Sequence, residues 1–470
     1  MLFAVEWKNE KLEEFFNYIR NRKIAIIGLG VSNIPLLSYL HDLGAKITVF
    51  DNRTIDNIDK NIMDIITNNN IEFSFGKNNL SKLNGFDIIF RSPTCREDWP
   101  ELVKEAKRGA IITSEIEMLM ELCPGTIIGV TGSDGKTTTT SLIYEIVKKQ
   151  GFNCYLGGNI GIPLFTKIQE MKPNDMVILE LSSFQLMNIH TSPNIAVITN
   201  ISPNHLDFHK YYEEYIEAKK NIFKYQNEDG ILVLNYDNEI TRECAKEAKG
   251  KVIFFSRENK LDNGVILDDD IIKVCDNKLR KHILNTKDLL LRGKHNYENV
   301  CTAIAATLEI ASTEKQIEAV TQFKGVKHRL EFVKEINGVK WYNDSIGTSP
   351  TRTIAGLKSF NEKIVLIAGG YDKHLDYTPI AKPILDNVSV LILMGQTSKK
   401  IKESVENEMK VEQKRIEIYE CDTLQETVNT AKKVAKKGEV VLFSPASASF
   451  DMYKNFEERG DKFKSIVNSL

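Results

Sequence analysis

The sequence predicts an α/β protein of three domains whose sheets are mostly parallel. Short apolar, β-branched runs recur along the chain and alternate with segments of helical periodicity. Polar clusters follow several of these runs directly, as expected where parallel strands end at one edge of a sheet. The chain has 470 residues, and at roughly 150 residues per domain this length suggests about three domains.

The first domain is predicted over residues 1–114 as a Rossmann-like βαβ unit. The expected elements are strands at 23–30, 46–50 and 86–90 and a helix at 33–43. Gly28 and Gly30 end the first strand in a tight turn, and Asp51 follows the second strand at the spacing of dinucleotide-binding folds. Asn33 stands where that fingerprint has its third glycine, so the motif indicates a nucleotide more than it indicates NAD.

The second domain is predicted over residues 115–325 and the third over 326–470. For the second we expect strands at 126–130, 176–179 and 195–199, short strands between 250 and 290, and helices at 141–148, 211–225 and 298–310. For the third, a Rossmann-like unit, we expect strands at 339–342, 364–368, 390–394 and 440–443 with helices between them. The Lys/Glu-rich stretch 399–415 has the pattern of a solvated helix face.

Composition excludes several classes of protein. The chain has 62 Lys and Arg against 64 Asp and Glu, and 42% of its residues are hydrophobic. This near-neutral balance argues against electrostatic capture of nucleic acid, and no apolar run is long enough to span a membrane. The seven cysteines contain no Cys-x-x-Cys pair, and the N-terminus lacks a signal-peptide pattern. We therefore expect a cytoplasmic protein with reduced thiols and no zinc site.

The sharpest motif is glycine-rich and runs from Gly129 to Thr138, between an apolar strand and a helix. Glycines let successive backbone N–H groups point toward one anion, and the helix N-terminus adds its dipole. Lys136 is placed to reach the β- and γ-phosphates of a nucleotide, and the Thr137 hydroxyl to bind Mg²⁺. Val130 occupies the first glycine position of the strict motif, and a plain glycine-rich turn is the alternative.

Polar groups also follow the next two predicted strands. Glu180 ends one of them, where a P-loop enzyme needs a carboxylate for Mg²⁺, although Ser182 or Ser183 after it could equally cap a helix. Two histidines, His205 and His209, and an aspartate follow the other strand. This grouping favours a metal or phosphate site over isolated polar surface residues.

Three other segments are ambiguous from the residues alone. The stretch around Lys219 has the pattern of an amphipathic helix with solvated lysines. Asn296, before an Ala-rich helix, suits a nucleotide contact and plain helix capping equally. Arg329 could reach a phosphate across a cleft or form a salt bridge within a linker.

The predicted strand ends of the third domain carry hydroxyl groups and charges. They include Asp344, Thr348, Lys373 and Ser449, with Phe456 beyond them. Together these residues could line one pocket that offers a cation, hydroxyls and backbone N–H groups, which would suit a small dicarboxylate.

As a set, these motifs resemble those of the Mur ligases. The resemblance is carried by Gly-x-Thr-Gly-x-x-Gly-Lys-Thr at 129–137, Gly-Asn-Ile-Gly at 158–161, His-Leu-Asp at 205–207, Gly-x-His-Asn at 293–296 and His-Arg-x-Glu at 328–331. The runs Glu-Leu-Ser-Ser-Phe-Gln-Leu at 180–186 and Ser-Pro-Ala-Ser-Ala-Ser-Phe-Asp at 444–451 point to the member that adds D-glutamate. The resemblance extends from Gly28 to Gly460.

The resemblance implies a UDP-substrate-binding domain, a central P-loop ATPase domain and a C-terminal amino-acid-binding domain that closes on the others. It implies a cytoplasmic, monomeric ligase of peptidoglycan precursor synthesis that uses ATP, two Mg²⁺ ions and a carbamylated lysine. Its substrates would be UDP-N-acetylmuramoyl-L-alanine and D-glutamate, joined through an acyl phosphate. No nucleic-acid or membrane partner is implied.

By motif match, the resemblance also assigns site residues. ATP is assigned to Gly132, Gly135, Lys136, Thr137, Thr138, Asn296, Arg329 and Asp344. The UDP-sugar–alanine substrate is assigned to Ser32, Asp51, Arg53, Ser92, Asn159, Ser182 and His205. D-Glutamate is assigned to Thr348, Lys373, Ser449 and Phe456. The metal ligands would be Thr137, Glu180, His205 and Lys219 as its carbamate, and catalytic roles fall to Lys136, His205, Lys219 and Arg329.

The chain departs from the family pattern at three positions. Asn204 stands where some relatives carry Asp, Ile346 replaces a substrate-binding lysine, and Thr94 replaces the glycine of a Ser-Pro-Gly loop.

Three other functions compete with this interpretation. An NAD-dependent oxidoreductase would leave the P-loop unexplained. A P-loop switch that hydrolyses nucleotide without forming a bond would turn over nucleotide without any amino acid. A sister ligase that adds another amino acid would differ mainly in residues 326–470.

Overall fold

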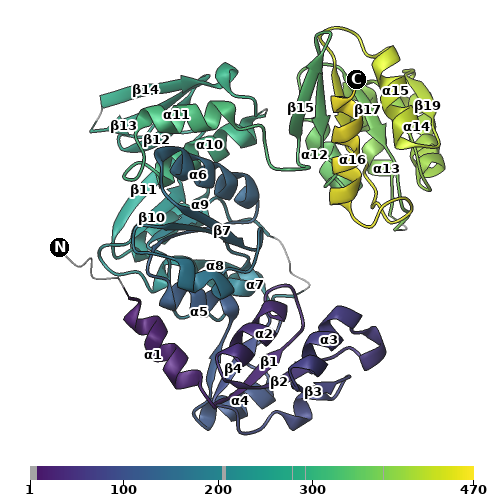
Figure 1. Ribbon diagram of the computed structural model, residues 1–470. Helices are drawn as coiled ribbons and strands as arrows, with labels where there is room; N and C mark the ends of the chain where they lie inside the picture. The colour runs from purple at the N-terminus through teal and green to yellow at the C-terminus, as the bar shows by residue number, and fades with distance from the viewer. Residues whose placement is uncertain (1–7, 204–207, 278, 292, 374) are drawn as a thin grey trace, which may run out of the picture. The chain divides into compact units, whose positions relative to one another are not determined.

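The computed structural model describes residues 8–203, 208–277, 279–291, 293–373 and 375–470, which form two compact units (Figure 1). The larger unit comprises residues 1–284 and 298–319, and the C-terminal unit comprises 285–297 and 320–470. The larger unit contains two sheets and the C-terminal unit contains one. The predicted α/β class with mostly parallel sheets is confirmed. The predicted domain boundaries at 114/115 and 325/326 stay predictions.

The first sheet is parallel throughout and has the strand order β3-β2-β1-β4-β5. Its strands are β1 (Lys23–Ile27), β2 (Lys46–Asp51), β3 (Glu72–Phe75), β4 (Ile88–Arg91) and β5 (Ile111–Thr113). The accompanying helices are α1 (Glu10–Ile19), α2 (Ile34–Asp42), η1 (Ile55–Asn57), α3 (Lys60–Asn68), η2 (Asn79–Lys82) and α4 (Pro100–Lys107). The strands added after β1 first extend the sheet on one side, through β2 and β3, and then on the other side, through β4 and β5. The loops after β1 and β4 therefore diverge and leave a crevice between them.

The central sheet has nine strands in the order β14-β13-β12-β11-β10-β9-β6-β8-β7. They are β6 (Thr126–Thr131), β7 (Cys154–Gly158), β8 (Met176–Glu180), β9 (Ile195–Ile198), β10 (Ile231–Asn235), β11 (Lys251–Ser256), β12 (Gly264–Asp268), β13 (Ile271–Asp276) and β14 (Leu279–Asn285). The pairs from β7 to β12 are parallel, and β12 pairs with β13 in the antiparallel sense. Strands β8 and β9 are buried along their whole length, which explains their continuous apolar sequences.

Helices connect these strands or follow them along the chain. They are α5 (Glu115–Leu122), α6 (Lys136–Gln150), η3 (Phe165–Glu170), α7 (Ser183–Leu186), α8 (Tyr212–Lys224), α9 (Glu239–Cys244), η4 (Ala245–Glu247), η5 (Thr286–Asp288), α10 (Lys294–Ala306) and α11 (Thr313–Gln322).

The C-terminal unit is built on a six-stranded sheet in the order β15-β16-β20-β17-β18-β19, parallel except for the β15–β16 pair. Its strands are β15 (Glu331–Ile336), β16 (Val339–Asn343), β17 (Ile364–Ala368), β18 (Val388–Leu393), β19 (Glu417–Glu420) and β20 (Val440–Phe443). Its helices are α12 (Pro350–Leu357), α13 (Thr378–Asn387), α14 (Ser398–Glu412), α15 (Leu424–Val434) and α16 (Phe456–Asn468). Helix α16 packs on the sheet through Phe463, whose ring stacks on that of Phe443 at 4.6 Å.

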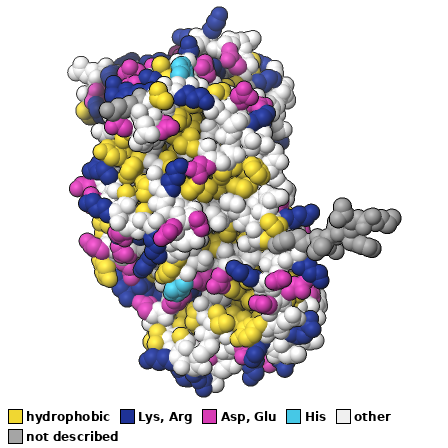
Figure 2. Space-filling model, turned by 90° about the vertical axis from the view of Figure 1, so that its left-hand side faces the viewer, with side chains coloured by type: hydrophobic (Ala, Val, Ile, Leu, Met, Phe, Trp, Pro, Cys, Tyr) yellow, Lys and Arg dark blue, Asp and Glu magenta, His cyan; other side chains and the backbone are white. Residues whose placement is uncertain are grey.

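The described helices are all too short or too polar to cross a lipid bilayer. On the face drawn in Figure 2, Lys and Arg side chains are interspersed with Asp and Glu, in agreement with the near-neutral composition.

Helix α5 connects the first sheet to the central one and carries a buried acid. One carboxylate oxygen of Glu115 accepts hydrogen bonds from the backbone N–H groups of Leu164 (3.0 Å) and Phe165 (2.9 Å). Leu164 ends the loop that begins at Asn159, and Phe165 begins η3. Burial raises the pKa of Glu115 to about 7, even though both N–H groups act in the opposite direction. The buried acid thus fixes one end of the loop that carries Asn159.

We expect Glu115→Gln to change how stability depends on pH. Folding raises the pKa of Glu115 from 4.5 to about 7. The contribution of this group to the free energy of unfolding is therefore fully present below pH 4.5 and is lost as the pH rises through 7. The loss amounts to about 3 kcal/mol. Glutamine keeps an oxygen for both N–H groups and does not titrate. Urea unfolding from pH 4.5 to 8 should show wild type losing stability relative to the variant, whereas parallel curves would contradict this prediction.

Candidate functional site

The glycine-rich loop follows β6 and leads into α6, as the sequence predicts. Gly132 has φ +150°, and a Cβ atom there would collide with Thr199 Oγ1 at the end of β9. The same Thr199 hydroxyl donates to the carbonyl of Asp134 at 2.6 Å, and Asn200 Oδ1 accepts from the Asp134 N–H at 3.0 Å. The end of β9 therefore holds the loop in shape, and only glycine fits at 132.

Helix α6 begins at Lys136, and its first turn faces this loop. The Lys136 ammonium donates to the carbonyls of Gly132 (2.9 Å) and Ser133 (3.0 Å). Thr137 is half-buried and Thr138 is buried in the same turn. A helix N-terminus with a lysine beside it attracts anions, so this region has the chemistry of a phosphate site.

Glu180 ends β8 next to this loop and is 2% exposed. Its Oε1 accepts from the Asn159 side chain at 2.9 Å, and its carbonyl accepts from the Asn159 N–H at 2.8 Å. Among the described residues, no hydrogen-bond donor reaches its Oε2. A buried carboxylate oxygen without a donor is costly, and a hard cation such as Mg²⁺ would satisfy it.

Ser182 forms a capping box with Gln185 at the start of α7, so the capping interpretation of this serine is confirmed. The next residue, Ser183, has its hydroxyl 3.0 Å from Nε2 of His209. His209 is buried and stacks on Phe184, and its Nδ1 lies 3.5 Å from Glu214 on α8. Burial lowers the pKa of His209 despite Glu214, so its ring joins α7 to α8 as a neutral group.

Lys219 is 1% exposed, so it is not a solvated surface lysine. Its Nζ donates to the Gly132 carbonyl at 2.7 Å and lies 3.3 Å from Thr131 Oγ1. Burial and repulsion from Lys136 lower the pKa of Lys219 well below its usual value, although Asp134 and Glu180 act in the opposite direction. The structure thus places an amine that loses its proton readily beside the P-loop. His205 and Asn204 lie outside the described residues.

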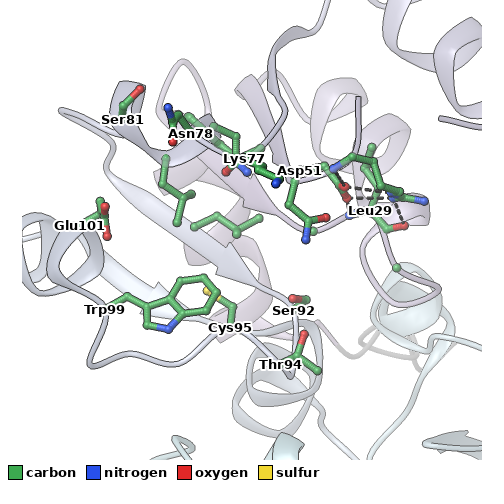
Figure 3. Close-up of a pocket in the computed structure, with 18 residues that line it drawn as sticks. Leu29, Asp51, Lys77, Asn78, Ser81, Ser92, Thr94, Cys95, Trp99 and Glu101 are labelled. Atoms are coloured by element: carbon green, nitrogen blue, oxygen red, sulfur yellow. Dashed lines mark hydrogen bonds and ion pairs between the residues drawn. The ribbon is translucent and has the colours of Figure 1, made fainter. Parts of the chain in front are cut away.

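A cavity of about 650 Å³ opens at the edge of the first sheet (Figure 3). Asp51, Arg53 and Ser92 line it, as does Thr94, the residue that departs from the family pattern. Ser32 is half-buried and is not one of the described residues that line the cavity. The lining residues come from the loops after β1, β2, β3 and β4, where a parallel sheet places its ligand sites.

Asp51 and Arg53 form an ion pair in the wall of this cavity. Arg53 donates to Oδ1 and to Oδ2 of Asp51, each at 2.8 Å, and the Leu29 N–H donates to Oδ2 at 2.8 Å. Burial alone would raise the pKa of Asp51, but these hydrogen bonds outweigh it and lower the pKa. The carboxylate therefore stays charged and holds the guanidinium at the cavity wall.

Sequence reasoning missed several residues of this cavity. Lys77 and Asn78 follow β3, a strand that the sequence analysis did not identify, and Trp99 lies just before α4 (Figure 3). Strand β3 is short and partly exposed, so it lacks the apolar run that marks its neighbours. Recognising β3 as the partner of β2 would have indicated the loop after it.

In the C-terminal unit, Asp344 lies buried at the end of β16. Its Oδ1 accepts from the Leu330 N–H at 3.1 Å and its Oδ2 from Ser444 Oγ at 2.6 Å. Burial raises the pKa of Asp344 to about 6, and these hydrogen bonds oppose the shift. Arg329 is half-buried one residue before Leu330, and Asn296 is buried in α10.

The four residues assigned to D-glutamate follow elements that are neighbours in this unit. Thr348 follows β16, Lys373 follows β17, Ser449 follows β20 and Phe456 begins α16. Because β20 lies between β16 and β17, the sheet places these loops at one edge. Lys373 is exposed, with its ammonium 5.6 Å from the centre of the Phe450 ring.

Within the described ranges, no three His, Cys, Asp or Glu side chains converge as a metal site. The expected metal site instead combines a hydroxyl, a single carboxylate, a modified lysine and His205, which lies outside those ranges. Its described members fit a cation through the unsatisfied oxygen of Glu180.

Comparison with known proteins agrees with this geometry. Three family models match the chain: the N-terminal domain of MurD-like Mur ligases at 22–114, the Mur ligase middle domain at 130–307 and the Mur ligase glutamate ligase domain at 328–447. The chain belongs to the Mur ligase family.

Similar Mur ligases cover almost the whole chain. A protein named UDP-N-acetylmuramoylalanine–D-glutamate ligase from Acetivibrio thermocellus is 51% identical over 98% of this chain and 99% of its own length. A ligase of the same name from Clostridium novyi is 48% identical over 97% of this chain and 99% of its own length.

Solved Mur ligase structures share the fold. The UDP-N-acetylmuramate-alanine ligase MurC of Thermotoga maritima aligns with a TM-score of 0.56 at 19% identity, over 96% of this chain and all of that one. The MurF ligase of Thermotoga maritima in complex with ADP aligns with a TM-score of 0.54 at 18% identity, over 97% of both chains. Mur ligases as a family are ATP-dependent amide-forming enzymes that use Mg²⁺.

We expect Gly132→Ala to weaken binding of Mg-ADP by at least about tenfold, equivalent to 1.4 kcal/mol. The new Cβ would collide with Thr199 and force the loop out of shape. Gly151→Ala is a matched control, because Gly151 also has a positive φ and ends the same helix but faces open space. Isothermal titration calorimetry should show the loss in the first variant only, and equal affinities for all three proteins would contradict the assignment.

Proposed function

We propose that this chain is an ATP-dependent ligase that joins D-glutamate to UDP-N-acetylmuramoyl-L-alanine in peptidoglycan precursor synthesis. The observation that carries this proposal is the similarity to ligases of that name, at 48–51% identity over nearly the full length of both chains. The glutamate ligase domain model at 328–447 supports the choice of amino acid.

The reaction forms one amide bond at the expense of one phosphoanhydride bond. The carboxylate of the L-alanine residue attacks the γ-phosphorus of ATP, and ADP leaves. The amine of D-glutamate then attacks the acyl carbon, loses a proton, and expels phosphate from a tetrahedral intermediate. The first step brings two anions together, so the protein must supply dense positive charge where they meet.

Lys136 and the first turn of α6 supply part of that charge. We assign the β- and γ-phosphates to the backbone from Gly132 to Thr138. The Lys136 ammonium, which donates to two loop carbonyls in this structure, would turn toward the phosphate oxygens. Arg329 would contact the phosphates, Asp344 the ribose and Asn296 the adenine.

Glu180 and Thr137 would hold Mg²⁺, and we infer two ions, with His205 and Lys219 serving the second. The unsatisfied Oε2 of Glu180 supports this assignment. When bound, Mg²⁺ screens the phosphate charge and polarises the γ-phosphorus. Asn159 orients the carboxylate of Glu180 by holding its other oxygen.

We propose that Lys219 is carbamylated in the active enzyme. Its neutral amine would add to CO₂ and release one proton, which places a carboxylate at the end of a long side chain. The low pKa of Lys219 favours this chemistry, because only the unprotonated amine is nucleophilic. A carbamate would also replace the repulsion between Lys219 and Lys136 with attraction.

The cavity of the first sheet would hold the uridine diphosphate. Asp51, Arg53 and Ser92 present hydrogen-bonding groups at its wall. Ser32 is assigned to the same substrate, and Asn159 and Ser182 to its sugar-alanine part. Thr348, Lys373, Ser449 and Phe456 would bind D-glutamate. We further propose that the enzyme acts as a cytoplasmic monomer without nucleic-acid or membrane partners.

Phosphate release with Mg-ATP tests the function. We expect release only when UDP-N-acetylmuramoyl-L-alanine and D-glutamate are both present, and not with L-glutamate, L-alanine, L-lysine or meso-diaminopimelate. Dependence on another amino acid would identify a sister ligase. Release without any acceptor would identify a nucleotide hydrolase and contradict the proposal.

Lys219→Ala should reduce ligation by roughly 100-fold or more, the usual effect of removing a group that stabilises transition-state charge. The neighbouring Lys220, which pairs with Glu217 and Glu247 on the surface, supplies the control, and Lys220→Ala should keep full activity. Circular dichroism would show that both variants fold. Substantial turnover by folded Lys219→Ala at ambient CO₂ would contradict the carbamate assignment.

Lys373→Ala should raise the KM for D-glutamate by about tenfold to 100-fold, the effect of losing a hydrogen bond between charged groups. The KM for ATP should stay within about twofold of wild type, because the two ligands do not share this lysine. Lys399→Ala, at another exposed lysine of the same unit, serves as control. An unchanged KM for D-glutamate would move the amino-acid site elsewhere.

A further inference from the structure

The four residues assigned to D-glutamate lie on separate segments, and one buried side chain donates hydrogen bonds to two of these segments. Arg459 belongs to α16, three residues after Phe456, and is 1% exposed. Neither the sequence motifs nor the proposed contacts assign it a role. Its position raises the question of what a fully buried arginine does beneath these loops.

Arg459 donates four hydrogen bonds to two loops. Its Nε and Nη2 reach the hydroxyl (3.0 Å) and the carbonyl (2.9 Å) of Ser345, in the loop that leads to Thr348. Its Nη1 reaches the carbonyls of Ser447 (3.1 Å) and Ala448 (2.7 Å), just before Ser449. One planar guanidinium therefore fixes the spacing of the loops after β16 and β20.

The loop that carries Lys373 packs against the same guanidinium. A Cβ atom on Gly370, whose φ is +151°, would lie 3.0 Å from Nη1 of Arg459. The carbonyl of Ala448, already bonded to Arg459, also accepts from the Tyr371 N–H at 3.0 Å. Because residue 370 has no side chain, this third loop can pack directly against the guanidinium of Arg459.

Four further contacts complete the cluster. The Ser345 hydroxyl donates to the Phe456 carbonyl at 2.8 Å, which joins the start of α16 to the first loop. The Ser447 hydroxyl lies 2.8 Å from Thr397 Oγ1 and 2.8 Å from the Tyr377 hydroxyl. Thr397 Oγ1 in turn accepts from the Gly370 N–H. All four segments therefore meet at Arg459 and Ser447.

The acceptors around Arg459 are neutral oxygens, which stabilise a buried charge only when several converge. Burial lowers the pKa of Arg459 to about 10, and Asp451 acts in the opposite direction. The group stays charged at neutral pH. Removing it would leave its carbonyl partners without a donor and free the loops to separate.

We propose that Arg459 is the positioning residue of the amino-acid site: it holds the loops of Thr348, Lys373 and Ser449 at the spacing that a bound dicarboxylate requires, without touching that substrate. This inference rests on the proposed function. It predicts that Arg459 governs the affinity for D-glutamate and leaves the affinity for ATP unchanged.

Arg459→Ala should raise the KM for D-glutamate by about tenfold or more while the KM for ATP stays within about twofold, a division that general loss of folded enzyme would not produce. Millimolar guanidinium chloride, far below the molar concentrations that unfold proteins, should restore a low KM for D-glutamate, and equal sodium chloride should not. Arg459→Lys keeps the positive charge but lacks the planar guanidinium, so its KM for D-glutamate should stay close to that of Arg459→Ala.

Ser447→Ala provides a milder variant that disturbs the same cluster, and it should also raise the KM for D-glutamate selectively. Arg415→Ala, at an exposed arginine of the same unit, should behave as wild type. If Arg459→Ala does not fold, the KM values of Arg459→Lys and Ser447→Ala test the positioning role of Arg459. Unchanged KM values in these folded variants, or equal increases for both substrates, would overturn the inference. A wild-type enzyme that ignores D-glutamate would instead overturn the proposed function.

Discussion

The larger unit is organised around a buried amine held against the backbone of the P-loop. Lys219 reaches the Gly132 carbonyl from α8, and the loop itself is fixed by Thr199 and Asn200 at the end of β9. Two lysines, Lys136 and Lys219, are thereby forced close together in a poorly hydrated place. This arrangement is unfavourable for an unliganded protein, and the phosphates, cations and carbamate of the proposed function would make it favourable.

Parallel sheets explain how distant residues meet. In the central sheet β6 lies between β8 and β9, so the P-loop lies between the ends of the strands that carry Glu180 and Thr199. In the C-terminal unit β20 lies between β16 and β17, and the three loops after these strands carry the proposed amino-acid contacts. In each case the strand order, rather than proximity in sequence, assembles the site.

Much of this fold could be predicted from the sequence, because buried parallel strands are continuous apolar runs. The runs at 126–130, 176–179 and 195–199 became β6, β8 and β9. Partly exposed strands such as β3 lack that signal, and the cavity residues after β3 were missed for that reason. Buried charges were harder still, because the sequence around Lys219 or Arg459 does not differ from that of a surface helix. Their burial depends on what packs against them, which only the tertiary structure supplies.

In the proposed reaction, the charges around the P-loop activate the substrate carboxylate through transfer of the γ-phosphoryl group. An isotope-transfer experiment tests this step. UDP-N-acetylmuramoyl-L-alanine with both oxygens of its carboxylate labelled with ¹⁸O would be ligated to D-glutamate by the wild-type enzyme with Mg-ATP. Mass spectrometry of the released phosphate should find one ¹⁸O atom in each ion, because the acyl phosphate passes one carboxylate oxygen to phosphorus. Unlabelled phosphate would mean that water, not the carboxylate, attacks ATP, and would contradict the account.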